Sequence, residues 1–393
     1  MTEFYIGLMS GTSLDGVDGV LAAFVPDDST PSAAPAQRLK VLAASSAAFD
    51  VGFRAELLAL NSPSHNELHR AALAGNRLAA AYAGVVHSLL QTAQVSGIQA
   101  RQVVAIGAHG QTVRHQPPGG RASGASCGGD QSYTLQLGNP SRLAELTGLT
   151  VVADFRSRDL AAGGQGAPLA PGFHQYLFSQ PDAAVAVLNL GGISNLTLLP
   201  PASSGGAVLG FDCGAGNALM DAWCQKHLGQ SYDDAGAWAA GGALIPELLA
   251  DLLDEPYFAK APPKSTGRDL FSTDWLAAKL KPFASRNPRD VQNTLAEFTV
   301  QPCLTGISSY QKNSDRLIVC GGGAFNTHLM TRLQASLPGV AVASSAEHGL
   351  PPLQVEAAAF AWLARQTIQG RTGNLPSVTG AAGARVLGAI YLA

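Results

Sequence analysis

Residues 4–25 read FYIGLMSGTSLDGVDGVLAAFV, and this stretch decides the fold. The apolar run 4–9 predicts a strand, and the run 17–25 predicts a second one. The glycine-rich stretch 10–16 between them predicts a turn, so the three parts together predict a β-hairpin. Glycine allows backbone N–H groups to approach an anion closely, which makes this turn a candidate phosphate loop.

The same pattern returns in the middle of the chain. Residues 184–190 are apolar, GGISN follows at 191–195, and a second apolar run covers 196–199. We therefore expect two halves that are distant duplicates, 1–180 and 181–393, each opening with a hairpin whose turn meets a phosphate. A length of 393 residues also favours two domains over one.

Strands, glycine loops and helices then alternate in the second half. Strands are predicted at 207–211, 317–320 and 340–343, and glycine-rich loops and helices follow the first two. This alternation predicts an α/β fold with ligand loops along one sheet edge. In the first half, apolar spacing predicts a long core helix after Pro63, and the Gly/Ser-rich stretch 116–132 predicts an exposed loop.

Composition excludes several classes of protein. Hydrophobic residues make up 46% and the net charge is only -3, which excludes intrinsic disorder. No basic block and no apolar stretch of 18 residues is found, so we expect neither nucleic acid nor a membrane as partner. The N-terminus lacks the pattern of a signal peptide. Five cysteines without CxxC or Cys/His spacing argue against a disulfide framework and a structural zinc, and favour a reducing compartment.

Four glycine turns, at residues 11, 191, 214 and 321, together predict a nucleotide phosphate site. The Walker pattern, the Rossmann fingerprint and the protein kinase HRD and DFG pair are absent. The KSTG sequence at 264–267 follows two prolines rather than a strand, so it is not a P-loop. Paired hairpin turns in two similar lobes remain, and this arrangement resembles the actin, sugar kinase and Hsp70 superfamily.

Seven ordered motifs resemble the anhydro-N-acetylmuramic acid kinase family. They are MSGTSLDGVD (9–18), GAHGQTVRH (107–115), DFRSRDLAAGGQGAPLAP (154–171), NLGGISN (189–195), GFDCGAGNALMDAW (210–223), PPKSTGRD (262–269) and CGGGAFN (320–326). The resemblance runs from about residue 4 to the C-terminus. Ala215 stands where the family pattern has proline, and the stretch 116–132 is longer than in the family.

This resemblance implies a fold, a reaction and ligands. The fold is the duplicated, ribonuclease H-like α/β fold of actin, sugar kinases and Hsp70, with the active site in the cleft between the lobes. The enzyme takes 1,6-anhydro-N-acetylmuramic acid, ATP and water, opens the anhydro ring and phosphorylates O6. The products are N-acetylmuramic acid 6-phosphate and ADP, in cell-wall recycling in the bacterial cytoplasm. We expect Mg²⁺ with the ATP, and a homodimer.

The expected nucleotide contacts lie in three glycine turns. The first phosphate loop consists of Gly11, Thr12, Ser13, Leu14, Asp15, Gly16, Val17 and Asp18. Within it, Asp15 or Asp18 would hold Mg²⁺ through water. The second phosphate turn consists of Gly191, Gly192, Ser194 and Asn195. Gly321, Gly322 and Gly323 would lie under the adenosine, because only glycine lets a ring lie that close to the backbone.

Asp212 is the expected general base. Ring opening needs a base that activates water for attack at the anomeric carbon, and a carboxylate can serve. Asp212 follows a predicted strand and precedes a glycine loop. From the residues alone, an N-cap of the following helix is an equal alternative. The family resemblance assigns Asp212 the catalytic role.

His109, Arg156 and Glu356 are the expected sugar contacts. An arginine binds a carboxylate through two hydrogen bonds, which suits the lactyl group of the sugar. For Arg156 a structural salt bridge to Asp154 or Asp159 stays open. For His109 a hydrogen-bonded core histidine stays open, and for Glu356 a plain salt bridge.

Other functions are also compatible with the glycine turns. One is another small-molecule kinase of the same superfamily that acts on a plain sugar or acid. A second is a sugar-sensing regulator built on a kinase fold, which would carry a DNA-binding helix-turn-helix. No such element is predicted before the first strand. An ATP-driven chaperone would need a client-binding domain for which the length leaves no room.

Overall fold

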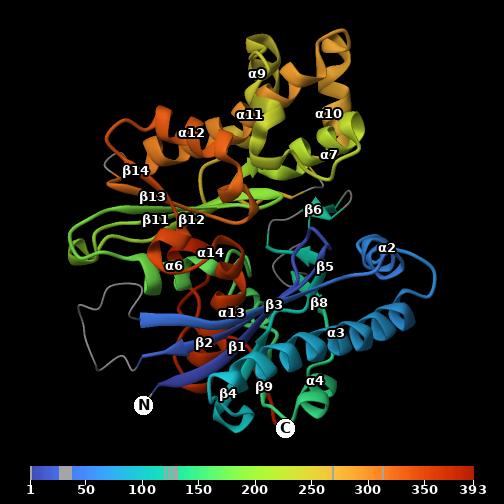
Figure 1. Ribbon diagram of the computed structural model, residues 1–393, viewed down its shortest axis with the longest axis vertical. Coiled ribbons are helices and arrows are strands. Elements are labelled where there is room, and N and C mark those ends of the chain that lie inside the picture. The colour runs from blue at the N-terminus through green and yellow to red at the C-terminus, as the bar shows by residue number, and fades with distance from the viewer. Residues whose placement is uncertain are drawn as a thin grey trace. The chain divides into compact units, whose positions relative to one another are not determined.

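The computed structural model describes residues 2–25, 38–118, 121–122, 125–126, 132–267, 270–311 and 314–393. The chain forms two compact units (Figure 1). The first consists of Met1–Leu177 together with Gln354–Ala393, and the second of Phe178–Leu353. Cys127 and much of the loop expected at 116–132 lie outside the described residues, as do positions 268 and 269 of the motif at 262–269.

The first unit contains a six-stranded sheet in the order β15-β9-β4-β1-β2-β3. Its strands are β1 Glu3–Met9, β2 Gly16–Phe24, β3 Leu39–Ala48, β4 Val103–Ala108, β9 Val151–Ala153 and β15 Ala389–Tyr391. β1, β2 and β3 pair antiparallel, whereas β1, β4 and β9 pair in parallel. The hairpin predicted at the start of the chain is confirmed, with Met9 opposite Asp18.

Helices cover both faces of this sheet. The helices are α2 Val51–Ala59, α3 Glu67–Val95, α4 Pro140–Thr147, α5 Ser157–Ala161, α6 Ala170–Phe178, α13 Val355–Ile368 and α14 Pro376–Thr379. Ile6 and Leu8 of β1 share one hydrophobic core with Leu78 of α3. Gly7 faces α13, because a Cβ there would collide with the carbonyl oxygen of Ala357. Alternate residues of a strand point to opposite faces, so α3 and α13 cover opposite faces of the sheet.

The smaller strands of the first unit lie outside this sheet. β5 Gln111–Gln116 pairs with β8 Tyr133–Leu137, and β6 Arg121–Ala122 pairs with β7 Ala125–Ser126. β6 and β7 lie within the stretch 116–132 that was expected to be a loop.

The C-terminal residues return to the first unit. β15 pairs with β9 at one edge of the sheet, and α13 packs against β1, β2 and β4. Arg365 of α13 is almost fully buried, and its Nε donates to Glu3 Oε2 at 2.8 Å. The range 181–393 predicted for the second lobe is therefore wrong for residues 354–393, because the helix formed there packs on the first sheet.

The second unit repeats the topology of the first. Its sheet has the order β12-β11-β10-β13-β14. The strands are β10 Val185–Leu190, β11 Ile193–Leu199, β12 Leu209–Ala215, β13 Arg316–Cys320 and β14 Ala341–Ser344. β10, β11 and β12 pair antiparallel, and β10, β13 and β14 pair in parallel. The duplication expected from two hairpins thus extends to five strands in each unit, in a two-lobed α/β fold.

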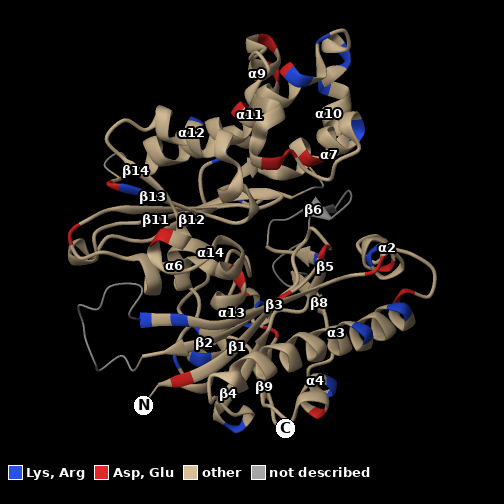
Figure 2. Ribbon diagram, viewed as in Figure 1, with Lys and Arg blue, Asp and Glu red and all other residues tan. Residues whose placement is uncertain are grey.

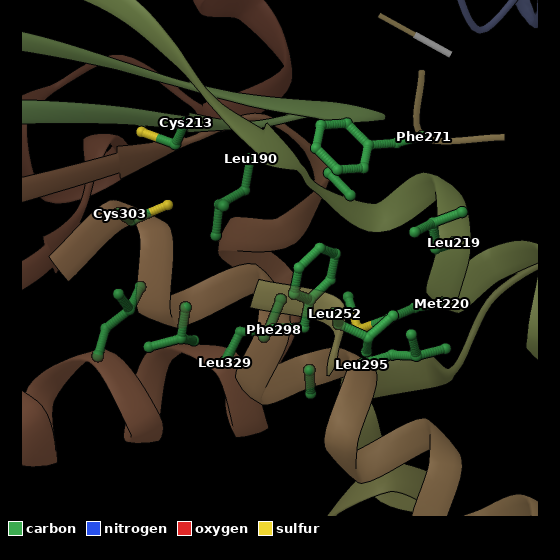
Figure 3. Close-up of a cluster of buried hydrophobic side chains, with 14 of the residues drawn as sticks. Leu190, Cys213, Leu219, Met220, Leu252, Phe271, Leu295, Phe298, Cys303 and Leu329 are labelled. Carbon is green, nitrogen blue, oxygen red and sulfur yellow. The ribbon is translucent and has the colours of Figure 1, made fainter. Parts of the chain in front are cut away.

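One hydrophobic core joins the helices of the second unit to its sheet (Figure 3). The helices are α7 Asn217–Leu228, α8 Ala237–Ala240, α9 Pro246–Leu253, α10 Thr273–Leu280, α11 Pro288–Tyr310 and α12 Thr327–Ser336. Leu190, Met220, Phe298 and Leu329 from four of these elements are buried together. Burial of a large apolar side chain contributes about 1.5–3 kcal/mol, so this core fixes the strand ends that carry the glycine turns.

Charged residues are scattered over the described parts of both units (Figure 2). Lys and Arg lie on several helices and loops of both units, and so do Asp and Glu. None of the helices in the described residues combines the length and the hydropathy that a membrane span requires.

Candidate functional site

The turn between β1 and β2 has a fixed backbone conformation. Leu14 N–H donates to the carbonyl of Gly11 at 3.2 Å, and Leu14 adopts the left-handed conformation with φ of 59°. Its side chain is buried in the core of the first unit. A left-handed conformation costs a branched residue about 1 kcal/mol or more, and such strain collects at functional sites.

The residues of this first phosphate loop differ in accessibility. Thr12 is exposed, and Gly11 and Ser13 are half-buried. Val17 is buried in the core, like Leu14, so neither side chain is available to a ligand. The N–H groups and hydroxyls of residues 11–13 therefore remain accessible to an anion.

Asp15 and Asp18 lie close enough to influence each other. Asp15 forms an exposed ion pair with Arg54 at 3.4 Å. Asp18 is reached by solvent, yet the surrounding protein and the charge of Asp15 raise its pKa. The described residues contain no group of three or more ligating side chains. One or two carboxylates suffice for Mg²⁺ that keeps its waters and binds phosphates, so these residues fit that ion.

Arg156 and His109 form a pair in the first unit. Arg156 Nε and Nη2 lie 3.1 and 2.9 Å from His109 Nε2, and Nη1 donates to the carbonyl of Gly166 at 2.8 Å. Burial and the charge of Arg156 lower the pKa of His109 to about 3, so the imidazole is neutral. Because Nε2 accepts from the guanidinium, the proton lies on Nδ1, 3.3 Å from the carbonyl of Ser10.

Ser10 links this pair to the first phosphate loop. Its hydroxyl lies 2.9 Å from Tyr82 Oη and donates to the carbonyl of Gly110 at 3.1 Å. Next to it, Gln111 Nε2 donates to the carbonyl of Gly11 at 3.1 Å. His109 and Arg156, two of the three expected sugar contacts, are therefore connected to the first phosphate loop by hydrogen bonds. His109 is also buried and hydrogen-bonded, as the alternative of a core histidine requires.

Asp159 supports Arg156 indirectly, through Gly166. Its fully buried carboxylate accepts from Gly166 N–H at 2.7 Å, from Asn374 at 2.6 Å and from the hydroxyl of Thr379 at 2.7 Å. These bonds fix the carbonyl of Gly166, which receives the guanidinium of Arg156. Asp159 was weighed only as a salt-bridge partner of Arg156, and its positioning role was missed.

The salt-bridge alternatives for the sugar residues are not found in the described residues. No ion pair joins Arg156 to Asp154 or Asp159, and none involves Glu356. Glu356, in the first turn of α13, is reached by solvent. The surrounding protein nevertheless keeps enough water away to raise the pKa of Glu356; the charge of Arg156 opposes that shift, and the charge of Asp18 adds to it. The charges of Arg156 and Asp18, from the same unit, therefore both act on Glu356.

A cavity of about 330 Å³ lies beside His109. It opens at the C-terminal ends of β4 and β9, where Ala108 and Ala153 line it. Tyr82, Thr134, Gln136, Asn139 and Asp154 contribute polar groups to its wall, among the apolar residues Leu78, Leu137 and Leu143. This volume is within the range of small-molecule sites, and the mixed lining suits a sugar.

Asp212 lies inside β12 of the second unit. The strand continues through Ala215, beyond the end predicted at 211, and Gly216 rather than Asp212 is the N-cap of α7. The N-cap alternative is therefore wrong. Asp212 pairs with Asn195 of β11, and a β-bulge lies between Ser194 and Asn195. Bulges are common next to active sites because they redirect a side chain.

Three neighbours hold Asp212 in place. The hydroxyl of Tyr257 donates to its carbonyl at 2.7 Å, its N–H donates to the carbonyl of Lys264 at 3.2 Å, and Thr266 N–H donates to Oδ2 at 2.9 Å. Burial raises the pKa of Asp212 to about 7, against the opposing effects of Thr266 and the charge of Lys264. A carboxylate with a pKa near the working pH is suited to general base catalysis.

The second glycine turn is tied to α7. The carbonyl of Gly191 accepts from Asn217 N–H at 2.8 Å, and that of Gly192 accepts from Gly216 N–H at 3.0 Å. Ser194 is fully buried, and its hydroxyl donates to the carbonyl of Gly214 at 3.1 Å. The Ser194 hydroxyl therefore stabilises the turn, and phosphate binding here stays a prediction for Gly191, Gly192 and Asn195.

The three glycines after β13 have different surroundings. Gly321 has φ of 77°, and a Cβ there would collide with Asn189 Oδ1. A Cβ at Gly323 would collide with Leu190. At Gly322 the nearest atom, Asn217 Nδ2, would be 3.7 Å away, and the residue is exposed. The fold thus requires Gly321 and Gly323, whereas Gly322 leaves its surface open to a ligand.

Comparisons with known proteins agree over the whole chain. The family model described as anhydro-N-acetylmuramic acid kinase matches residues 3–393. A relative of that name from Variovorax paradoxus is 61% identical over 391 residues, covering 99% of both chains. Another, from Albidiferax ferrireducens, is 58% identical over 408 residues and covers 100% of both.

Solved structures show a weaker likeness. The activator of the 2-hydroxyisocaproyl-CoA dehydratase from Clostridium difficile with bound ADPNP is 12% identical, with a TM-score of 0.43 and coverage of 91% of this chain and 92% of that one. A ROK family glucokinase from Streptomyces griseus in complex with glucose and AMPPNP is 14% identical, with a TM-score of 0.39 and coverage of 92% and 99%.

Proposed function

Since the chain belongs to the anhydro-N-acetylmuramic acid kinase family, we propose that it acts on 1,6-anhydro-N-acetylmuramic acid with ATP and water. The products are N-acetylmuramic acid 6-phosphate and ADP, in cell-wall recycling. The observation that carries the chemistry is Asp212, whose carbonyl, N–H and carboxylate are each hydrogen-bonded and whose carboxylate has a pKa of about 7.

Asp212 is the general base of this reaction. It takes a proton from water as the water oxygen forms a bond to C1 of the sugar. The C1–O6 bond breaks and leaves its electron pair on O6, which bonds to the γ-phosphorus as the bond from phosphorus to ADP breaks. Phosphorus captures the departing O6, so a separate general acid is not needed. About half of Asp212 is ionised near pH 7, which provides the required base.

Arg156, His109 and Glu356 bind the sugar. The guanidinium of Arg156 pairs with the lactyl carboxylate, and its half-buried, hydrogen-bonded position favours a specific geometry. His109 holds the guanidinium through Nε2 and stays neutral, so it positions Arg156 rather than transferring a proton. Glu356 accepts hydrogen bonds from sugar hydroxyl or acetamide groups.

Gly11, Thr12 and Ser13 bind the phosphates of ATP through N–H groups and hydroxyls, together with Gly191, Gly192 and Asn195. Gly322 faces the adenosine. Asp18 is the better candidate to hold Mg²⁺ through water, because Asp15 is already paired with Arg54. When bound, Mg²⁺ neutralises phosphate charge.

We place the enzyme in the cytoplasm as a homodimer, on the ground of family resemblance. Light scattering tests the dimer.

An ADP-release assay tests the assignment. It compares anhydro-N-acetylmuramic acid with N-acetylglucosamine and N-acetylmuramic acid at equal concentrations. We expect ADP release with the anhydro sugar and little with the other two. Release with a plain sugar alone would favour the other sugar kinases of the superfamily.

A further inference from the structure

The segment 262–267 is tied to Asp212 by its backbone. Asp212 N–H donates to the carbonyl of Lys264 at 3.2 Å, and Thr266 N–H donates to Asp212 Oδ2 at 2.9 Å. Two bonds from one residue to positions 264 and 266 fix the backbone on both sides of Ser265. The side chain of Lys264 therefore starts from a defined position next to the proposed base.

Aromatic rings hold the ammonium group of Lys264. Its Nζ lies 4.9 Å from the ring centre of Tyr257 and 5.8 Å from that of Phe211. Both rings are buried, and the hydroxyl of Tyr257 donates to the carbonyl of Asp212 at 2.7 Å. A cation over an aromatic face is stabilised by the charge distribution of the ring, but this contact leaves N–H donors unused.

Among the described residues, none accepts a hydrogen bond from Lys264 Nζ or forms an ion pair with it. Lys279, also half-buried, shows the usual arrangement, with Nζ 2.6 Å from the carbonyl of Asp251 and 3.1 Å from its carboxylate. Burial lowers the pKa of Lys264, as expected for a poorly solvated ammonium. An anionic ligand would satisfy the three donors.

The charges around Lys264 and Asp212 are few. The pKa of Lys264 is influenced by the charges of Asp212, Cys213 and Lys260. The titratable neighbours of Asp212 are Lys264, Cys213 and Tyr257. The hydrogen bond with Cys303, together with burial, raises the pKa of the Cys213 thiol, and burial raises that of Tyr257. Both groups are therefore neutral near pH 7. Asp212 is the anionic neighbour of Lys264, and it loses its charge when it accepts a proton.

We propose that Lys264 is a further catalytic residue, whose ammonium group donates hydrogen bonds to the oxygens of the transferred phosphoryl group. This inference rests on the proposed function. As Asp212 takes the proton from water, its attraction for Lys264 is lost while negative charge leaves the sugar for phosphorus. The ammonium group of Lys264 then pairs with the phosphoryl group that is being transferred. Hydrogen bonds from a cation to this group are strongest in the transition state, so they lower the barrier.

The test uses Lys264→Met, which keeps an unbranched apolar stem, and Lys264→Arg, which keeps the charge. We expect Lys264→Met to lower kcat by about 100-fold, the usual effect of removing one transition-state donor, with the KM for the sugar unchanged. Loss of the positive charge also raises the pKa of Asp212, so the acidic limb of the rate profile moves to higher pH. Lys264→Arg should restore part of the rate and the original limb. Lys279→Met is the control, expected to affect melting temperature but not rate.

Calorimetry separates this inference from the proposed function. Binding of a non-hydrolysable ATP analogue, relative to ADP, should weaken in Lys264→Met, whichever sugar the enzyme uses. Equal loss for both nucleotides, or a kcat within threefold of the parent with a raised KM for the sugar, would overturn the phosphoryl contact and point to the sugar carboxylate. Failure of the parent enzyme to release ADP with the anhydro sugar would instead contradict the proposed function.

Discussion

The guanidinium of Arg156 approaches Nε2 of His109 through two nitrogens, Nε at 3.1 Å and Nη2 at 2.9 Å. The opposite ring nitrogen of His109 lies 3.3 Å from the carbonyl of Ser10, the residue before the first phosphate loop. One neutral imidazole thus connects the proposed sugar clamp to the proposed phosphate loop. Because the lone pair of Nε2 is occupied, His109 cannot also serve as a base.

His109→Leu should therefore weaken sugar binding without changing the pH dependence of the rate. The guanidinium loses its acceptor, so we expect the KM for the sugar to rise by about 10-fold or more, as when a charged hydrogen bond worth about 1.5–3 kcal/mol is lost. His109→Gln, whose amide oxygen can accept from Arg156, is the matched variant and should retain most of the affinity. Loss of a titration limb in His109→Leu would show that the imidazole transfers a proton after all.

Asp212→Asn should keep the binding of ATP and sugar but lose nearly all turnover. Removal of a general base costs about 10²–10⁴-fold in rate, and the amide retains the shape of the carboxylate. In the parent enzyme, kcat/KM should rise with pH through about 7, because the base is active when deprotonated. A variant that keeps more than about a tenth of the parent kcat, which is above the range for a lost base, would place the base elsewhere.

The same carboxylate should make stability depend on pH. Its pKa is about 7 in the folded protein and about 4 in the unfolded chain. Between these values the folded state holds the proton that the unfolded state has released, so this contribution to stability falls as pH rises. The Asp212→Asn variant has no carboxylate at this position, so it does not lose this stability as pH rises. Its melting temperature relative to the parent should therefore increase from pH 5 to pH 8.

Gly322→Val should raise the KM for ATP and leave sugar affinity largely intact. The added side chain meets no close neighbour in the fold, since the nearest atom to a Cβ is 3.7 Å away, so stability should change little. Gly321→Val is the contrasting variant and should destabilise the protein, because φ is 77° and a Cβ collides with Asn189. Calorimetric titration with an ATP analogue decides the matter, and unchanged affinity would remove Gly322 from the nucleotide site.

The hairpins and glycine turns could be predicted because they depend on residues adjacent in sequence. Apolar runs on both sides of residues 10–16 and 191–192 specify a strand, a turn and a strand without reference to the rest of the chain. The strand that carries Asp212 was also predicted, but its end was not. After a bulge near Ser194, β11 and β12 remain paired as far as Ala215, and bulges have no clear sequence signal.

Contacts between distant residues could not be predicted. Lys264 lies 52 positions from Asp212, and a KSTG sequence after two prolines gives no sign that it packs on β12. The return of α13 to the first sheet depends on Gly7 and Gly107, whose missing side chains admit the helix backbone. A glycine in a strand is compatible with many neighbours, so this pairing appears only in the folded chain.

The central claim is that water attacks C1 with the help of Asp212 while O6 leaves directly for phosphorus. Reaction in ¹⁸O-labelled water, followed by mass spectrometry and NMR of the product, tests it most directly. The account predicts label on the C1 hydroxyl, none on the transferred phosphoryl group, and a first-formed anomer inverted at C1, because water enters opposite the departing O6. Label in the phosphoryl group, or an initially retained anomer, would contradict it.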